Sequence, residues 1–170
     1  MKTYVFQVKT GSEAKAAEQL QRHVEEDKAV CYVPHFVTMQ KKNGEWTQVR
    51  KVLFPGYVFA ETHDIVPFAA RLSEALLSAR LLCQEDGTPL RIQDEEIAWI
   101  SALADNVTKT VDMSEGVIEG DEIRITSGPL KGQEAKIRRI DRHKRIAFVE
   151  MRLLGRTKTI RLGLEVVSKK

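Results

Sequence analysis

Residues 119–137 read Glu-Gly-Asp-Glu-Ile-Arg-Ile-Thr-Ser-Gly-Pro-Leu-Lys-Gly-Gln-Glu-Ala-Lys-Ile. Ile123 and Ile125 alternate with charged and polar neighbours, which predicts a half-buried strand. Segment 128–132 combines glycines, which tolerate positive φ, with a proline of fixed φ, and is typical of a tight turn. The alternation resumes beyond that turn. We therefore expect a strand-turn-strand hairpin that opens a small barrel.

The rest of the C-terminal third contains only short strand patterns separated by glycine turns. The expected strands are 122–126, 134–140, 145–152, 157–161 and 165–167. Five short strands in about fifty residues favour a small SH3-like barrel, and we assign it to residues 118–170.

Residues 1–105 show strand patterns and helix patterns in alternation. We expect a strand at 4–8, a helix capped by Thr10 and Glu13, a hairpin turning at Asn43-Gly44, and a strand from Tyr57. Further helices are expected over 68–79 and from Asp94. Segment 106–117 has no clear period and is interpreted as a linker. The predicted fold class is α+β.

The distribution of charged residues also separates the C-terminal part of the chain from the rest. The 170 residues carry a net charge of +3, but residues 118–170 carry +7 and residues 1–117 carry −4. A basic module joined to an acidic one indicates two surfaces with different partners. No apolar run is long enough for a membrane span and no signal-peptide core is present, so we expect a soluble, cytoplasmic protein.

The sequence lacks the residue spacings that are typical of metal sites and phosphate-binding loops. The four histidines show no metal-ligand spacing with Cys31 or Cys83. The glycine turn at 128–132 does not end in the Gly-Lys-Ser/Thr of a phosphate loop. We therefore expect no catalytic residues, no metal and no cofactor.

Three segments resemble the NusG family of transcription elongation factors: residues 4–12, the element Phe54-Pro55-Gly56-Tyr57-Val58, and 120–132 with 154–157. Together they span nearly the whole chain in the family's order. The resemblance implies that residues 1–105 form an NGN-like α/β domain, with an antiparallel sheet and helices, that binds RNA polymerase. A KOW barrel follows it. The excess of basic residues in the barrel suggests a specialised antitermination paralogue of the LoaP type.

The resemblance also assigns a polymerase-binding element at Phe54, Pro55, Tyr57 and Phe59. Tyr57 and Phe59 share a strand face. If helices cover the opposite face, theirs is an apolar patch suited to the clamp helices of the largest polymerase subunit. The alternative is that these aromatic residues belong to the core.

A basic cluster in the barrel is the candidate RNA-binding site. Its members are Arg138, Arg139, Arg142, His143, Lys144, Arg145, Arg156 and Lys158. Arginine suits bidentate phosphate contacts, and the expected ligand is nascent RNA, in particular a hairpin. Phe148 is the one aromatic residue of this region, so recognition should depend on RNA shape and phosphates more than on stacked single strands. The alternative is an ordinary solvated surface.

Leu154 lies at an apolar turn between strands. By resemblance it is a candidate contact for a protein partner of the barrel, either a small-subunit ribosomal protein or the termination factor Rho. The predicted function is a transcription elongation factor that promotes processive antitermination. The alternative is a structural RNA-binding protein resembling a KOW ribosomal protein, and co-purification with polymerase or with ribosomal particles separates the two.

Overall fold

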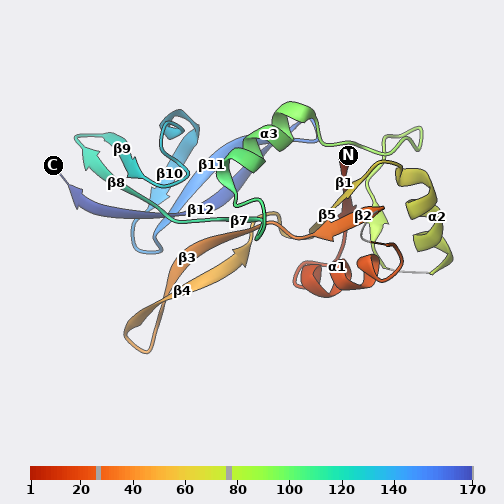
Figure 1. Cartoon of the computed structure of the whole chain (residues 1–170). Helices are drawn as coiled ribbons and strands as arrows, with labels where there is room; N and C mark the ends of the chain where they lie inside the picture. Colours follow the sequence, from red (N-terminus) through yellow and green to blue (C-terminus); the bar gives the residue numbers. More distant parts are fainter. Residues whose placement is uncertain (26–27, 76–77, 170) are drawn as a thin grey trace. The chain divides into compact units, whose positions relative to one another are not determined.

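The computed structural model describes residues 1–25, 28–75 and 78–169, and the chain folds into two compact units. The first unit comprises residues 1–34 and 54–97, and the second comprises 35–53 and 98–170. Figure 1 shows the elements of each unit. The mixed architecture, helices with an antiparallel sheet in one unit and a small barrel in the other, confirms the predicted α+β class.

The first unit is built on a four-stranded antiparallel sheet in the order β2-β5-β1-β6. Its elements are β1 (Lys2–Gln7), α1 (Glu13–Gln21), β2 (Ala29–Tyr32), β5 (Tyr57–Thr62), α2 (Ile65–Glu74) and β6 (Arg80–Leu81). Phe68 of α2 packs edge-on against Phe6 of β1, with ring centroids 5.5 Å apart. Because Phe6 pairs with Val58, this helix covers the sheet face opposite Tyr57 and Phe59.

The two helix starts differ from the predictions. Ser12, not Thr10, is the N-cap of α1, although the Glu13 carboxylate does reach back to accept from the Gly11 N–H at 2.7 Å. α2 begins at Ile65, three residues earlier than expected, because Asp64 caps it by accepting from the Val66 N–H at 3.1 Å. Residues 76–77 of the expected helix lie outside the described residues.

The second unit contains a long hairpin formed by β3 (His35–Lys42) and β4 (Glu45–Val52). Asn43 and Gly44 turn it with φ values of 53° and 82°, as their sequence predicts. The strand β7 (Thr110–Val111) pairs in parallel with the start of β3. The helix α3 (Asp94–Leu103) begins in the first unit and ends in the second.

The barrel strands of this unit follow the order β10-β11-β12-β8-β9. Their bounds are β8 (Ser114–Glu119), β9 (Glu122–Ser127), β10 (Ile137–Asp141), β11 (Ile146–Leu153) and β12 (Arg156–Lys169), with the 3₁₀ turn η1 (Glu134–Lys136) before β10. The inward positions of β11 are all buried: Ala147, Val149, Met151 and Leu153. β12 is one continuous strand where two short ones were expected.

The predicted hairpin at the centre of 119–137 is wrong. β9 pairs with β8 through a two-residue turn at Gly120-Asp121, and it lies at the opposite edge of the strand order from β10. Segment 128–132 is instead a loop that inserts Leu130, fully buried, into the barrel. The Leu130 N–H donates to the Ser114 hydroxyl at 3.0 Å, which fixes the loop against β8.

The segment expected to be a linker contains β7 and most of β8. It lacks a hydrophobic period because Ser114 and Gly116, two inward positions of β8, are small. Gly116 has no room for a side chain, since an added Cβ would lie 2.9 Å from the Arg124 carbonyl oxygen. The division into domains 1–105 and 118–170 stays a prediction.

The β3–β4 hairpin packs on the outside of the barrel at the start of β11. Gly163 of β12 lies so close to β3 that an added Cβ would collide with the Val37 carbonyl oxygen. Ile146, which pairs with Gly163, is buried beneath the hairpin side of the barrel. The Thr38 hydroxyl donates to the Arg145 carbonyl at 3.2 Å. Backbone proximity and this hydrogen bond therefore contribute to holding the hairpin on the barrel.

Over the described part of the chain, no helix is long and apolar enough to cross a membrane. The same residues contain no group of three or more His, Cys, Asp or Glu side chains placed to hold a metal ion.

Candidate nucleic-acid and polymerase surfaces

The cationic turn between β10 and β11 carries three consecutive members of the predicted RNA-binding cluster. Arg142, His143 and Lys144 are all exposed. The Asp141 carboxylate accepts from the Lys144 N–H at 3.0 Å, which holds the turn in a defined conformation. These three side chains therefore project together from a rigid support.

Arg145 follows this turn but is engaged within the protein. Its φ of 56° directs the side chain back toward the hairpin. Its guanidinium lies 4.0 Å from the centroid of the Trp46 ring, and it forms an ion pair with Glu165 at 3.7 Å. Arg145 thus fastens β4 to the barrel, and its contribution to RNA binding would require it to leave these contacts.

Two further members of the predicted cluster are also partnered. Arg138 forms an ion pair with Glu150 at 3.0 Å and donates to the Ala135 carbonyl at 2.8 Å. Arg139 stacks over the Phe148 ring at 4.0 Å. Phe148 is therefore half-buried beneath an arginine.

Arg156 and Lys158 lie at the other end of the barrel. They pair with Leu153 and Met151, at the end of β11 farthest from the cationic turn. Eight residues of strand separate the two ends by about 23 Å at ~3.3 Å per residue. The predicted cluster is therefore divided into an exposed turn, a partnered middle and a distant pair.

Leu154 occupies the two-residue turn that joins β11 to β12. Its φ is 55°, in the left-handed region that apolar residues seldom adopt, and its side chain is half-buried. An apolar side chain is thus displayed at the tip of the barrel by a backbone conformation that would suit glycine better.

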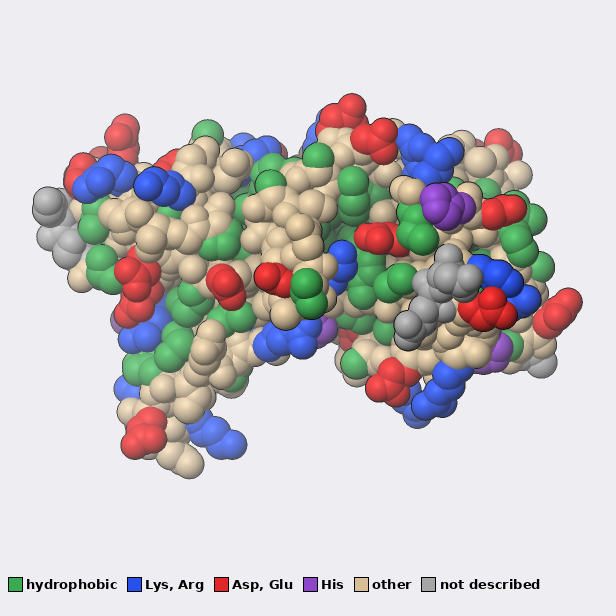
Figure 2. Space-filling view, in the orientation of Figure 1, with side chains coloured by type: hydrophobic (Ala, Val, Ile, Leu, Met, Phe, Trp, Pro, Cys, Tyr) green, Lys and Arg blue, Asp and Glu red, His purple; other side chains and the backbone are tan. Residues whose placement is uncertain are grey.

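The second unit brings basic residues to this surface that the sequence analysis missed. The β3–β4 hairpin carries four cationic side chains, Lys41, Lys42, Arg50 and Lys51, against one acidic residue, Glu45. Lys and Arg side chains lie along this hairpin in Figure 2. The close spacing of these cations in the sequence could have identified the hairpin as basic. No sequence pattern predicts that the hairpin lies beside the cationic turn.

The predicted polymerase-binding element is tied to the start of α1 by a buried carboxylate. Glu13, which is 3% exposed, accepts from the Gly56 N–H at 3.0 Å with one oxygen and from the Gly11 N–H at 2.7 Å with the other. The Val8 N–H also donates to the Gly56 carbonyl at 2.8 Å. The turn after Phe54 is therefore rigid.

Only part of this element reaches the surface. Phe54 and Phe59 are buried, 3% and 0% exposed, and stack with centroids 5.3 Å apart. Tyr32 packs on the same Phe59 ring at 5.7 Å. Pro55 is exposed and Tyr57 is half-buried. The expected apolar patch of Tyr57 and Phe59 is thus not present as an exposed surface, because Phe59 belongs to the core.

Two titratable groups beside this element have raised pKa values. Burial, reinforced by the neighbouring Glu61 carboxylate, raises the pKa of Tyr32, whose hydroxyl donates to Glu61 at 3.0 Å. Burial raises the pKa of the Cys31 thiol to about 12. Both groups are therefore neutral at physiological pH, which keeps this part of the sheet edge uncharged apart from Glu61.

An α/β unit followed by a small SH3-like barrel defines a two-part α+β architecture. Residues 1–101 match the family described as transcription termination factor NusG, and residues 119–151 match the KOW motif. The first match covers more than half of the sequence, so the chain belongs to the NusG family. It is a transcription factor of the termination and antitermination class, in a family of non-enzymatic proteins.

Individual relatives are similar along nearly the full length. The transcription termination/antitermination protein NusG of Staphylococcus carnosus is 24% identical, over 98% of this chain and 94% of its own. The NusG protein of Staphylococcus epidermidis shows the same identity and coverage. A solved structure titled "Domain interaction in Thermotoga maritima NusG" is similar in fold, with a TM-score of 0.51 and 20% identity over 97% of this chain and 93% of that one. The predicted family is confirmed.

Proposed function

We propose that this protein is a cytoplasmic elongation factor that binds RNA polymerase through its N-terminal domain and promotes processive antitermination. On the polymerase, the proposed contact is with the clamp helices of the largest subunit. On this protein, the proposed contact residues are Pro55 and Tyr57, with Phe54 and Phe59 packed beneath them. The factor acts by binding one state of the polymerase more tightly than another, without chemistry of its own.

The observation that carries this proposal is the rigid, partly exposed turn at Pro55–Tyr57. Its backbone is fixed by the buried Glu13 carboxylate, and its underside is filled by the stacked pair of Phe54 and Phe59. A tyrosine held in place by such a support loses little conformational freedom on binding, and tyrosine is one of the residues on which interfaces most often depend.

The barrel is assigned a second contact, with nascent RNA. Arg142, His143 and Lys144 are exposed together at one turn, and the barrel segment carries +7. Arg156 and Lys158 would form a separate contact at the far end. An excess of cations on this barrel favours a specialised antitermination paralogue of the LoaP type. Leu154, displayed at the tip of the β11–β12 turn, is the proposed contact for a protein partner, a small-subunit ribosomal protein or Rho.

The test is a polymerase pull-down followed by a read-through assay on terminator templates. We expect Tyr57→Ala to weaken polymerase binding by at least about tenfold, as is typical for an aromatic residue central to an interface, and to abolish read-through. Trp46→Ala, an aromatic substitution in the other unit, is the matched control and should leave polymerase binding unchanged. Recovery of ribosomal particles without polymerase would instead establish the alternative, a structural RNA-binding protein.

A further inference from the structure

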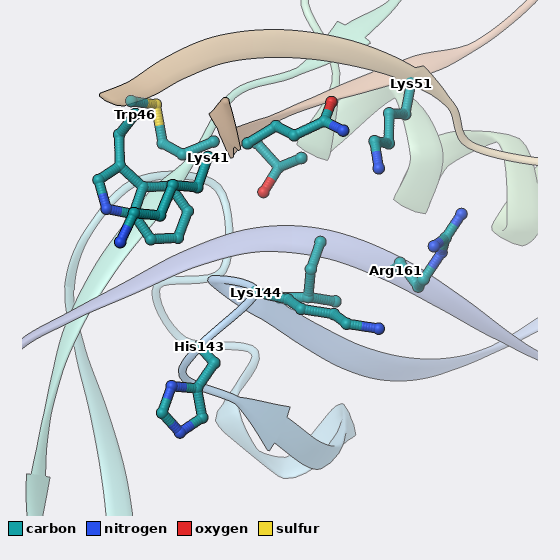
Figure 3. Close-up of a pocket in the computed structure, with 10 residues that line it drawn as sticks. Lys41, Trp46, Lys51, His143, Lys144 and Arg161 are labelled. Atoms are coloured by element: carbon teal, nitrogen blue, oxygen red, sulfur yellow. The ribbon is translucent and has the colours of Figure 1, made fainter. Parts of the chain in front are cut away.

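A cleft of about 300 Å³ lies within the second unit, between the β3–β4 hairpin and the barrel. The residues that determine its chemistry are Lys41, Trp46 and Lys51 from the hairpin and His143, Lys144 and Arg161 from the barrel. In Figure 3, Lys51 and Arg161 approach one another from opposite walls, while Trp46 and Lys41 lie together toward the other end. The His143 ring points away from the hairpin in the same view.

The cleft concentrates positive charge without compensation. No aspartate or glutamate is among the residues that line it. Within residues 1–25, 28–75 and 78–169, no ion pair involves Lys41, Lys51, Lys144 or Arg161. By contrast, Arg145, which lies on the Trp46 ring, is paired with Glu165. Four cations that face one space repel each other, and an anion between them would relieve that repulsion.

The cleft also has an aromatic wall. Trp46 is half-buried and lines the cleft, and the Arg145 guanidinium is stacked on its ring at 4.0 Å. This stacking holds the indole in place. A fixed aromatic ring beside a row of cations is the arrangement by which proteins bind unpaired bases and the phosphates that join them. A base within a duplex cannot offer its face to such a ring, because that face is stacked on its neighbours.

We propose that this cleft binds a single-stranded polynucleotide, with phosphates held by Lys51 and Arg161 and a base stacked on Trp46. The inference rests on the proposed contact with nascent RNA. It specifies that the cleft binds a single strand with a stacked base, where the sequence predicted recognition by RNA shape and phosphates. The expectation that recognition avoids stacking followed from Phe148 being the one aromatic residue of the barrel. Phe148 and Trp46 each have an arginine over the ring at 4.0 Å, but Trp46, which the hairpin supplies from a distant part of the sequence, lines the cleft, whereas Phe148 is not among the lining residues.

Fluorescence can report on this site because the chain has two tryptophans, Trp46 and Trp99. The Trp99 N–H donates to the Gln133 side chain at 3.1 Å, and Trp99 is not a residue of the cleft. The full-length Trp99→Phe variant therefore reports on Trp46, and the full-length Trp46→Phe variant reports on Trp99. Thermal melting of both variants establishes that each is folded. Each is titrated with oligouridylate, with oligodeoxythymidylate of equal length, and with an RNA hairpin.

We expect oligouridylate to quench the emission of Trp46 in the Trp99→Phe protein and to leave Trp99 unaffected in the Trp46→Phe protein. In the Trp99→Phe protein, a second substitution, Lys51→Gln or Arg161→Gln, should weaken binding several-fold. It should also reduce the slope of log affinity against log salt concentration by about 0.7 for each phosphate that is no longer neutralised. Lys131→Gln, the same charge change at an exposed loop position of the barrel, should have no such effect. Quenching by the deoxy oligomer would support the same cleft and indicate DNA as an additional or alternative source of the strand.

Unchanged Trp46 emission, while the RNA hairpin binds, would overturn the inference and leave the contact with structured RNA in place. Equal weakening by Lys131→Gln and Lys51→Gln would also overturn it, because the attraction would then be diffuse. Neither result bears on polymerase binding, which the pull-down with Tyr57→Ala tests separately.

Discussion

Aromatic residues have opposite surroundings in the two units. In the first unit, Phe59 is enclosed by other aromatic rings, those of Phe54 and Tyr32. In the second unit, Trp46 and Phe148 each lie under an arginine. Neighbours of the first kind make a ring part of the core. A neighbour of the second kind holds a half-buried ring beside a positive charge, and the Trp46 ring also lines the cleft between the hairpin and the barrel.

The largest expected difference between the two settings is in stability. Phe59→Ala should lower the free energy of unfolding by about 3–5 kcal/mol, because it removes a fully buried ring from a packed sheet. Trp46→Ala should cost far less, because Trp46 is half-buried. Thermal and denaturant melting of the two variants measures the contrast. Similar losses in both would show that Trp46 is as much a core residue as Phe59.

A smaller loss of stability is expected at the Glu13 carboxylate beneath the proposed polymerase-binding element. Glu13→Gln leaves one oxygen to serve the Gly11 and Gly56 N–H groups that two oxygens serve in the native chain. One of these two donors, of which Gly56 is buried and Gly11 is exposed, then faces the side-chain amide NH2 group instead of an oxygen, at a cost of about 1–2 kcal/mol. Denaturant unfolding checks the magnitude, and polymerase pull-down checks whether the turn also loses its binding geometry. Glu18→Gln, an exposed position of the same helix, is the matched control.

The hairpin's attachment to the barrel should be sensitive to a single methyl group. Gly163→Ala places a Cβ against the Val37 carbonyl, and overpacking of this kind costs about 1–3 kcal/mol. If the hairpin moves away, Arg145 leaves the Trp46 ring and the Trp46 emission should shift to the red. Gly155→Ala is the control: this glycine has open space around it but a φ of 75°, so the alanine is strained by its backbone alone, and the Trp46 emission should not shift. An unshifted spectrum for Gly163→Ala would mean that the barrel, not the hairpin, absorbs the strain.

The smallest effects concern the two ends of the barrel. Replacing Arg142 and Lys144 by glutamine should flatten the salt dependence of RNA binding by about 0.7–0.9 for each phosphate that these side chains neutralise. Replacing Arg156 and Lys158 should flatten it less, because Lys158 is half-buried and has other contacts. Stability should change little in either double variant. If the two double variants showed equal slopes of log affinity against log salt concentration, the assignment of the cationic turn as the main RNA contact would be contradicted.

Local chemistry predicted the elements that depend on neighbouring residues. Asn43-Gly44 predicted its hairpin because a tight turn needs positive φ at two adjacent positions. The strands beginning at Tyr57 and at Ile146 followed from alternation. The fold class and the family were therefore accessible from the sequence, since short motifs in the right order carry that information.

Pairing between distant segments could not be predicted in the same way. The alternation of Ile123 and Ile125 identified a strand but not its partner, and the Gly120-Asp121 turn that selects β8 was overlooked beside a more prominent glycine loop. The candidate site depended still more on tertiary structure. Trp46 and Arg145 are far apart in the sequence, and only the packing of the hairpin on the barrel joins them. Composition revealed the charge of the surface but not which cations are paired.

The central position of β12 has a consequence for biosynthesis. This strand lies between β11 and β8, pairing antiparallel with one and in parallel with the other, yet it is the last strand of the barrel to be translated. The hairpins β8–β9 and β10–β11 therefore leave the ribosome as two separate halves with no shared hydrogen bonds along their facing edges. Protease sensitivity of chains stalled before and after residue 169 would reveal when the halves join. Closure of the barrel depends on pairing between residues far apart in sequence, which makes it a late and comparatively slow step.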